Sequence, residues 1–367
     1  MTDDELEARL GATYATCART IGWRRPSDPA AAFAGLARAC EELGIDEWDV
    51  YAEHGAVERL EREVRELLGK PAAAFFPSGI MAQQAALRVH TERAGCPRVA
   101  LPDLSHLLVH EEDAVRVLQG LRVETLTRGF TAPHADHLQA IPGRLGAVLV
   151  ELPLRDAGCL LPSYDDLAGL SAACRRRGVA LHLDGARLWE SVDFLGHTLA
   201  DIAALGDTVY VSFYKGLGGL AGAMLLGEED VIAEARLWRR RMGGTIFRNT
   251  AMVVSALAGL RDRLGVIPAC VHWARAFAAA LPDAITVQPP IPHTNQFLAY
   301  ASVDPAAVNA RLLAYTQRED LALGGAPWYV PAKDPGRAMT EFIIGDGALE
   351  LDPVETATLV GDLVAGA

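Results

Sequence analysis

Short apolar runs alternate with amphipathic helical segments between residues 146 and 241, and this alternation restricts the fold more than any other feature of the chain. Runs typical of buried strands lie at 146–152, 179–184, 208–213 and 222–226, and the helical patterns between or after them lie at 164–177, 201–205 and 228–241. Strands separated by helices of this length form a mostly parallel sheet that is covered on both faces. The sequence therefore predicts an α/β fold.

The same pattern divides the chain into a large and a small part. Residues 51–255 carry the alternation, so we expect them to form one large domain. Residues 256–367 contain long helical patterns and weaker strand signals at 296–301 and 341–344, which predict a smaller α+β domain. Residues 1–50 are Ala-rich and helical in pattern, and we expect this segment to join the smaller domain.

Charge and composition exclude several classes of partner. The chain has 47 acidic and 34 basic residues and a net charge of -13, so its surface repels nucleic-acid backbones and anionic membranes. No apolar run approaches the ~20 residues that a membrane helix needs. The six cysteines form no CxxC pair, and the N-terminus is acidic where a secretory signal would be basic and then apolar. We therefore expect a cytoplasmic protein that acts on a small molecule.

Lysine is scarce in this chain, which makes its positions informative. Of the 34 basic residues only Lys70, Lys215 and Lys333 are lysines. Lys215 follows the run at 208–213 and Asp184 ends the run at 179–184, so both are expected at the edge of the sheet where ligands bind. An amine and a carboxylate at that edge suit pyridoxal phosphate, because the amine forms a Schiff base and the carboxylate keeps the pyridinium nitrogen protonated. A buried ion pair or a polar turn is the alternative interpretation.

Two further motifs are compatible with such a site. Ser78 and Gly79 stand at a predicted strand-to-helix junction, where free N–H groups bind phosphate, although an ordinary helix cap has the same sequence. His106 and His110 are four residues apart and could share a metal ion, but no third ligand is evident and we expect no metal. His106 is otherwise a histidine packed in the core or one that stacks on a flat cofactor ring.

Six segments, taken together, resemble a known family. In chain order they are VYAEHGAVERLE, FFPSGIMAQQAAL, SHLLVHE, HLDGARLWE, SFYKGLGGLAGAMLLG and RRRMGGTIFRNT, and they extend over residues 51–260, more than half of the chain. Their order and spacing resemble the threonine aldolase and β-eliminating lyase group of fold-type I pyridoxal phosphate enzymes. The resemblance implies the fold-type I architecture, in which a mostly parallel mixed sheet is covered by helices and accompanied by a smaller lobe.

The resemblance also implies catalytic roles for three residues. Lys215 would form the Schiff base with pyridoxal phosphate, and Asp184 would pair with the pyridinium nitrogen. His106 would stack on the cofactor ring, and His106 or a water that it holds would be the base. All three residues would thus act directly on the cofactor or the substrate.

Other residues would bind the cofactor by the same resemblance. Ser78, Gly79 and the N–H group of Ile80 would hold the phosphate, and Arg187 would lie beside the cofactor or the substrate carboxylate. Arg248 matches an arginine that reaches the cofactor phosphate of a neighbouring subunit. The resemblance therefore implies a homodimer or homotetramer with shared active sites.

The sequence departs from the family pattern at several positions around the expected site, and nothing before Tyr51 resembles the N-terminal segment that supplies substrate contacts in the family. Ile80 stands where a threonine is usual, and Tyr214 stands where a small hydroxyl residue is usual. Leu154 replaces a polar or ionisable side chain, and Glu341 falls at or near the position of an arginine that binds the substrate carboxylate. A carboxylate at that position would repel the substrate carboxylate. We therefore expect a retained cofactor site and an altered substrate site.

The expected activity is that of a carbon–carbon lyase acting on an amino acid. Retro-aldol cleavage of a β-hydroxy-α-amino acid to glycine and an aldehyde is the reaction that the resemblance favours. β-Elimination, transamination or aldol chemistry on an unusual amino acid is the alternative, which the altered substrate contacts favour. A protein that binds pyridoxal phosphate without turnover is a third hypothesis, against which the presence of Lys215, Asp184 and His106 argues.

Overall fold

The computed structural model describes residues 2–24, 28–324 and 326–366, which form two compact units. The larger unit is Ala34–Leu264, and the smaller unit combines Met1–Phe33 with Gly265–Ala367. The domain boundaries expected after residues 50 and 255 differ from this division, which places residues 34–50 and 256–264 in the larger unit. One reason is that α12 (Thr250–Arg263) runs without interruption across residue 255 and packs against α3 (Gly55–Leu68).

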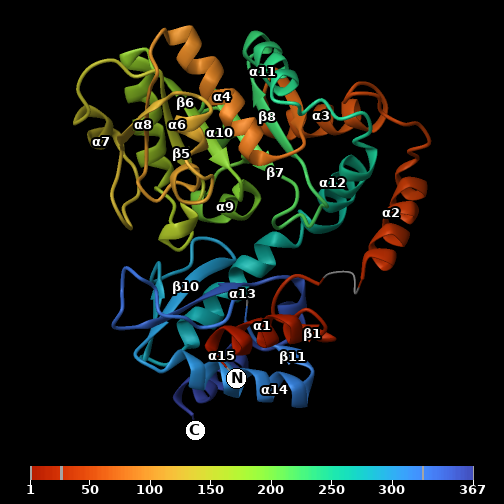
Figure 1. Ribbon diagram of the computed structural model, residues 1–367, viewed down its shortest axis with the longest axis vertical. Coiled ribbons are helices and arrows are strands. Elements are labelled where there is room, and N and C mark those ends of the chain that lie inside the picture. The colour runs from red at the N-terminus through yellow and green to blue at the C-terminus, as the bar shows by residue number, and fades with distance from the viewer. Residues whose placement is uncertain (1, 25–27, 325, 367) are drawn as a thin grey trace. The chain divides into compact units, whose positions relative to one another are not determined.

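A seven-stranded sheet forms the centre of the larger unit (Figure 1). Its order is β2 (Ala72–Phe76), β8 (Ala223–Gly227), β7 (Thr208–Ser212), β6 (Ala180–Gly185), β5 (Ala147–Glu151), β3 (Arg98–Leu101) and β4 (Arg122–Thr125). Strand β8 is antiparallel to both of its neighbours, and every other adjacent pair is parallel. The predicted α/β fold with a mostly parallel sheet is confirmed, whereas β3 and β4 were not predicted.

Helices pack against this sheet through small and branched side chains. Helices α4 (Gly79–Ala94) and α11 (Glu229–Arg241) lie side by side in Figure 1 and share a buried cluster with strands β2, β7 and β8. The remaining helices of this part of the chain are α2 (Pro29–Leu43), α5 (His106–Val109), α6 (Ala114–Val117), α7 (Ala135–Gln139), α8 (Tyr164–Arg177), α9 (Leu188–Leu195) and α10 (Leu199–Ala203), with a short 3₁₀ helix η1 (Arg155–Ala157). Helix α3 contacts β2 and α8 contacts β6.

Helix α8 illustrates how local sequence sets these elements. It begins after Ser163, whose Oγ accepts a hydrogen bond from the N–H of Asp166 at 3.1 Å, and Gly178 ends it at a positive φ of 62°. Acidic residues lie in its first turn and arginines in its last, where the helix dipole favours each charge. These signals are all local, so the predicted range 164–177 agrees with the observed helix.

The smaller unit is an α+β structure with its own core. An antiparallel sheet has the order β12 (Ala338–Ile343), β10 (Gln296–Ala301) and β9 (Ile285–Gln288), and β1 (Arg19–Thr20) pairs in parallel with β11 (Leu321–Ala322). Its helices are α1 (Asp3–Tyr14), α13 (Ile267–Ala280), α14 (Pro305–Glu319), α15 (Pro353–Ala365) and the 3₁₀ helix η2 (Asp346–Glu350). Phe277, Phe297 and Phe342 pack against one another in this core. None of the helices in the described ranges combines the length and apolar character that a membrane crossing requires.

Candidate active site

A pocket in the larger unit collects residues that follow the carboxyl ends of its parallel strands. Glu151 is the last residue of β5, Asp184 lies next to the end of β6, and Lys215 follows β7. Six of the eight residues expected from the sequence to act on the cofactor or the substrate line this pocket: Gly79, Ile80, His106, Asp184, Arg187 and Lys215. Residues that are up to 136 positions apart in the chain are therefore brought to one sheet edge, as parallel topology requires.

Asp184 and Glu151 form a pair of buried carboxyl groups on neighbouring strands. The two residues are register partners in the β5–β6 ladder. Asp184 accepts hydrogen bonds from Gln83 Nε2 at 2.6 Å and from the N–H of Ala186 at 3.0 Å, and Glu151 accepts one from Ser105 Oγ at 2.8 Å. Burial raises the pKa of both carboxyl groups, and the charge of Asp184 raises the pKa of Glu151 further. A cationic N–H partner in the pocket would therefore stabilise the ionised form of Asp184.

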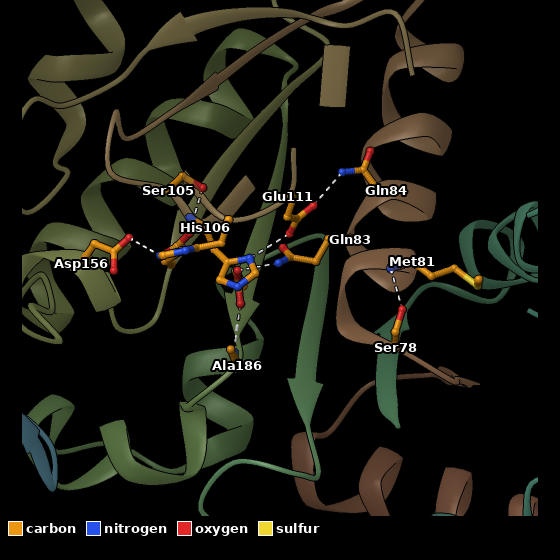
Figure 2. Close-up of polar contacts among 12 residues, drawn as sticks. Ser78, Met81, Gln83, Gln84, Ser105, His106, Glu111, Asp156 and Ala186 are labelled. Atoms are coloured by element: carbon orange, nitrogen blue, oxygen red, sulfur yellow. Dashed lines mark hydrogen bonds and ion pairs between the residues drawn. The ribbon is translucent and has the colours of Figure 1, made fainter. Parts of the chain in front are cut away.

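His106 is oriented by a buried carboxylate (Figure 2). Its Nδ1 lies 3.0 Å from Oε1 of Glu111, and the other oxygen of Glu111 accepts a hydrogen bond from Gln84 Nε2 at 2.9 Å. The backbone N–H of His106 donates to Glu151. Because a carboxylate oxygen accepts hydrogen bonds, Nδ1 is the donor in this contact, and Nε2 is left as the proton acceptor of the ring. This arrangement prepares His106 to accept a proton at Nε2.

Lys215 has the electrostatic environment of a nucleophilic amine. Burial, together with the positive charges of Arg187 and Arg155, lowers its pKa to about 8. About one molecule in ten then carries a neutral amine at pH 7, compared with fewer than one in a thousand for an ordinary lysine. The amine of Lys215 is therefore able to attack a carbonyl carbon near neutral pH.

The first turn of α4 offers hydrogen-bond donors beside the pocket. Ser78 caps the helix, and its Oγ accepts the N–H of Met81 at 3.2 Å while its carbonyl accepts the N–H of Ala82 at 3.3 Å. A Cβ on Gly79 would lie 2.1 Å from the hydroxyl oxygen of Tyr210, so only glycine fits at this position. Within the described chain the N–H groups of Gly79 and Ile80 have no acceptor. A helix N-terminus with two unused donors favours an anion.

Helix α9 contacts two parts of the site, Arg187 and Gly216, which follows Lys215. Arg187 precedes this helix, and its carbonyl accepts a hydrogen bond from Ser191 Oγ at 2.8 Å. Glu190, in the first turn, is buried, and burial raises the pKa of its carboxyl group. A Cβ on Gly216 would lie 2.1 Å from Oε1 of Glu190, so the glycine after Lys215 permits a close approach of the backbone to this carboxyl group.

Arg248 and Ser78 are the two expected site residues that do not line the pocket. Ser78 is adjacent to it as the cap of α4. Arg248 is exposed, donates to the carbonyl of Asp49 at 3.1 Å and stacks on the rings of Trp48 and Phe247 at 5.1 and 4.8 Å. The role that was expected for Arg248, in a neighbouring subunit's site, needs no contact with the pocket of its own chain.

Sequence reasoning missed several polar residues that line the pocket, among them Glu111, Glu151, Gln83 and Arg155. Glu151 ends a predicted strand beside Asp184, and its position at the carboxyl end was a signal that could have identified it. Gln83 lies in α4 and gives no such signal, because a buried glutamine is recognised only from its partners Asp184 and His182. Arg155 begins the short helix η1 after β5, where charge alone does not distinguish a pocket residue from an exposed one.

Two departures from the family pattern have clear positions. The side chain of Leu154 is buried and packs with Leu104 and Ala157, while the adjacent Arg155 lines the pocket. Glu341 lies on β12 in the smaller unit, where Gln296 Nε2 donates a hydrogen bond to its Oε1. Its expected effect on the substrate carboxylate stays a prediction.

Comparisons with known proteins support one family. The model of the β-eliminating lyase family matches residues 32–304. The chain is 38% identical over 209 residues to aldolase vrtJ of Penicillium aethiopicum, covering 54% of this chain and 52% of that protein. It is 30% identical over 232 residues to low-specificity L-threonine aldolase 1 of Arabidopsis thaliana, covering 59% and 63% respectively. These matches thus span between half and two thirds of the relatives' length.

Solved structures extend the similarity to nearly the whole chain. A Listeria monocytogenes protein assigned as an L-allo-threonine aldolase has a TM-score of 0.89 and 32% identity, with 98% of this chain and 99% of that chain covered. A threonine aldolase from Leishmania major has a TM-score of 0.69 at 19% identity, which shows the shared fold. The two units described above therefore have counterparts in solved structures.

Proposed function

Because this chain belongs to the β-eliminating lyase family, we propose that it is a pyridoxal-phosphate-dependent lyase that cleaves a β-hydroxy-α-amino acid into glycine and an aldehyde. The similarity to curated aldolases and to the Listeria protein supports this reaction. The predicted fold-type I architecture agrees with these structural neighbours. The substrate and the assembly of the protein are parts of the same proposal.

The residues of the pocket fit pyridoxal phosphate. Asp184 is a buried carboxyl group with a raised pKa, and a protonated ring nitrogen would give it a cationic partner that stabilises its ionised form. The N–H groups of Gly79 and Ile80 at the start of α4 suit the phosphate. Lys215, with its lowered pKa, is the amine that would hold the cofactor covalently. When bound, pyridoxal phosphate acts as an electron sink for the bond that breaks.

The protein's own residues would position the substrate and move protons. In this proposal, Nε2 of His106 accepts the proton of the substrate's β-hydroxyl group, while Glu111 holds Nδ1 and stabilises the positive charge that develops on the ring. Arg187 lines the same pocket and would hold a carboxylate of the amino acid. Glu151 fixes the start of α5 by accepting the N–H of His106, which limits movement of the base.

The single observation that carries the proposal is the convergence of Lys215, Asp184 and His106 on one pocket. The test is to incubate the protein, loaded with pyridoxal phosphate, with a panel of β-hydroxy-α-amino acids and to quantify glycine and aldehyde. Equimolar release of the two products is expected for at least one member. A pyridoxal-phosphate-bound protein that releases neither from any member would contradict the proposal and favour binding without turnover.

β-Elimination is the second candidate, and the name of the matching family favours it. The same pocket residues would then expel a leaving group from Cβ instead of breaking the Cα–Cβ bond. The products separate the two reactions, since elimination releases ammonia and a keto acid whereas aldol cleavage releases glycine. Both are measured in the same incubation.

Arg248 supports the proposal of a homodimer or homotetramer with shared sites. It is surrounded by exposed aromatic side chains, with Trp48 63%, Phe247 52% and Tyr51 49% exposed, and Tyr51 packs edge-on against Phe247. Aromatic and arginine side chains are enriched in protein interfaces. In an assembly Arg248 would reach the cofactor phosphate of the neighbouring subunit.

A further inference from the structure

A second arginine lines the pocket, in addition to the one expected from the sequence. Arg155 begins η1, directly after the buried Leu154, and it faces the pocket that Arg187 and Lys215 also line. Its side chain is 33% exposed. Leu154 is buried and pairs with Leu160 across the loop, and the carbonyl of Arg155 accepts the N–H of Gly158, so the backbone at Arg155 is fixed. The guanidinium group therefore belongs to the pocket and is held there by the fold.

Side chains next to the pocket orient this guanidinium group. Its Nη1 donates to Oδ1 of Asp156 at 2.8 Å, and Oδ2 of Asp156 lies 2.7 Å from Nε2 of His110. The ring of His110 lies 5.1 Å from that of His106, measured between centroids. The chain of contacts from Arg155 through Asp156 to His110 thus ends beside the histidine that we propose as the base.

The contacts of the carboxyl groups in the pocket are compatible with a carboxylate-binding role for Arg155 in addition to Arg187. Within the described residues the carboxyl groups that line it already have donors: Gln83 for Asp184, and Ser105 for Glu151, while Glu111 contacts His106. A guanidinium group has five N–H donors in a planar fork, which matches the two oxygens of a carboxylate. The positive charge of Arg155 is close enough to Lys215 to lower the pKa of its amine, so it acts on the space where the substrate would bind.

We propose that Arg155 is a specificity-determining residue that binds a carboxylate of the amino-acid substrate, and that Asp156, held by His110, positions it. This inference rests on the proposed function, in which an amino acid occupies the pocket. The carboxylate has two possible sources. It is the α-carboxylate, shared with Arg187, or a second carboxylate on the substrate side chain, with Arg187 holding the α-carboxylate.

Calorimetric titration of the pyridoxal-phosphate-loaded protein with glycine and with L-aspartate tests the proposal without turnover. Arg155→Met removes the charge, and Arg155→Lys keeps it without the fork. Loss of a hydrogen-bonded charge contact weakens binding by about 10- to 150-fold. Weaker binding of both ligands to Arg155→Met identifies the α-carboxylate, and weaker binding of L-aspartate alone identifies the side-chain carboxylate. Affinities within two-fold of wild type for both ligands, or no binding of either ligand to the wild type, would overturn the proposal.

Two further variants separate positioning from general damage. Asp156→Asn should weaken the same ligands as Arg155→Met but by a smaller factor, and unchanged affinities would refute the positioning role of Asp156. Arg128→Met is the matched control, because Arg128 is an exposed arginine of the same unit that does not line the pocket. Arg155→Met should also raise the pKa of Lys215, an effect that altered packing alone does not require. If Arg155→Met selectively loses ligand binding while the wild-type protein releases no aldehyde, this inference stands and the aldol reaction is refuted.

Discussion

Nδ1 of His106 lies 3.0 Å from Oε1 of the buried Glu111, and this contact leaves Nε2 of the imidazole as its proton acceptor. Glu111 is fixed in turn by Gln84. A base oriented in this way by a carboxylate keeps one tautomer and gains stabilisation when it becomes charged. The pair is therefore the part of the pocket that we expect to accept the substrate's proton.

Replacing Glu111 should slow the reaction more than it weakens substrate binding. In Glu111→Gln the imidazole loses a charged partner, so we expect kcat to fall about 10- to 100-fold, a part of the ~10²–10⁴-fold that general-base catalysis supplies. KM should change much less. Steady-state kinetics on the best substrate of the panel measures both. Glu112→Gln is the control, since Glu112 is exposed and next in the chain; equal losses in the two variants would contradict the role of Glu111.

Attachment of the cofactor should depend on pH through Lys215. Only the neutral amine reacts, and because the pKa of Lys215 is lowered to about 8, the rate of pyridoxal phosphate incorporation into the cofactor-free protein should rise with pH and level off above about 8. Arg187→Met removes one of the charges that lower this pKa, so its midpoint should move to higher pH. Absorbance kinetics across a pH series gives the midpoint. A midpoint near ~10.4 in the wild type, the ordinary lysine value, would show that the pocket does not tune this amine.

Asp184 should be needed for rate more than for cofactor retention. Asp184→Ala removes the carboxyl group that would pair with the ring nitrogen, so we expect some pyridoxal phosphate to remain while kcat falls at least about 100-fold, or ~2.7 kcal/mol. Cofactor content by absorbance and kcat from the product assay are compared on one preparation. An Asp184→Ala protein with full cofactor and an unchanged rate would refute this role.

Shared active sites predict complementation between two inactive variants. Lys215→Ala lacks the attachment amine, and Arg248→Ala lacks the arginine that would reach a neighbouring site. Mixing the two under conditions that exchange subunits should restore activity, because a hybrid contains one site with both residues intact. A protein that is fully active as a monomer at nanomolar concentration would contradict shared sites.

The fold was predictable where local signals are strong. The helix at 164–177 has a serine cap, a terminal glycine and charges that match its dipole. The strands at residues 147–151, 180–185 and 208–212 each contain at least three apolar residues and are buried along almost their whole length. Strands β3 and β4 were missed because each has only four residues and β4 has charged residues at two of them. Four residues are too few to define a period.

The pocket was predictable only in part, for a related reason. Asp184 ends one predicted strand and Lys215 follows another, so parallel topology alone brings them together. Gln83 and Arg155 have no such anchor, since Gln83 lies inside helix α4 and Arg155 begins the short 3₁₀ helix η1. Their positions depend on tertiary packing, which a single sequence does not display.

The central claim is that Lys215 is the residue that binds pyridoxal phosphate covalently. The chain offers only two other lysines, Lys70, whose Nζ donates to the carbonyl of Gly206 at 2.6 Å, and Lys333 in the smaller unit. Borohydride reduction of the pyridoxal-phosphate-loaded protein, followed by peptide mass mapping, locates the modified lysine directly. We predict a single adduct on Lys215 that is absent from Lys215→Ala. An adduct on Lys70 or Lys333 in place of Lys215 would contradict the account.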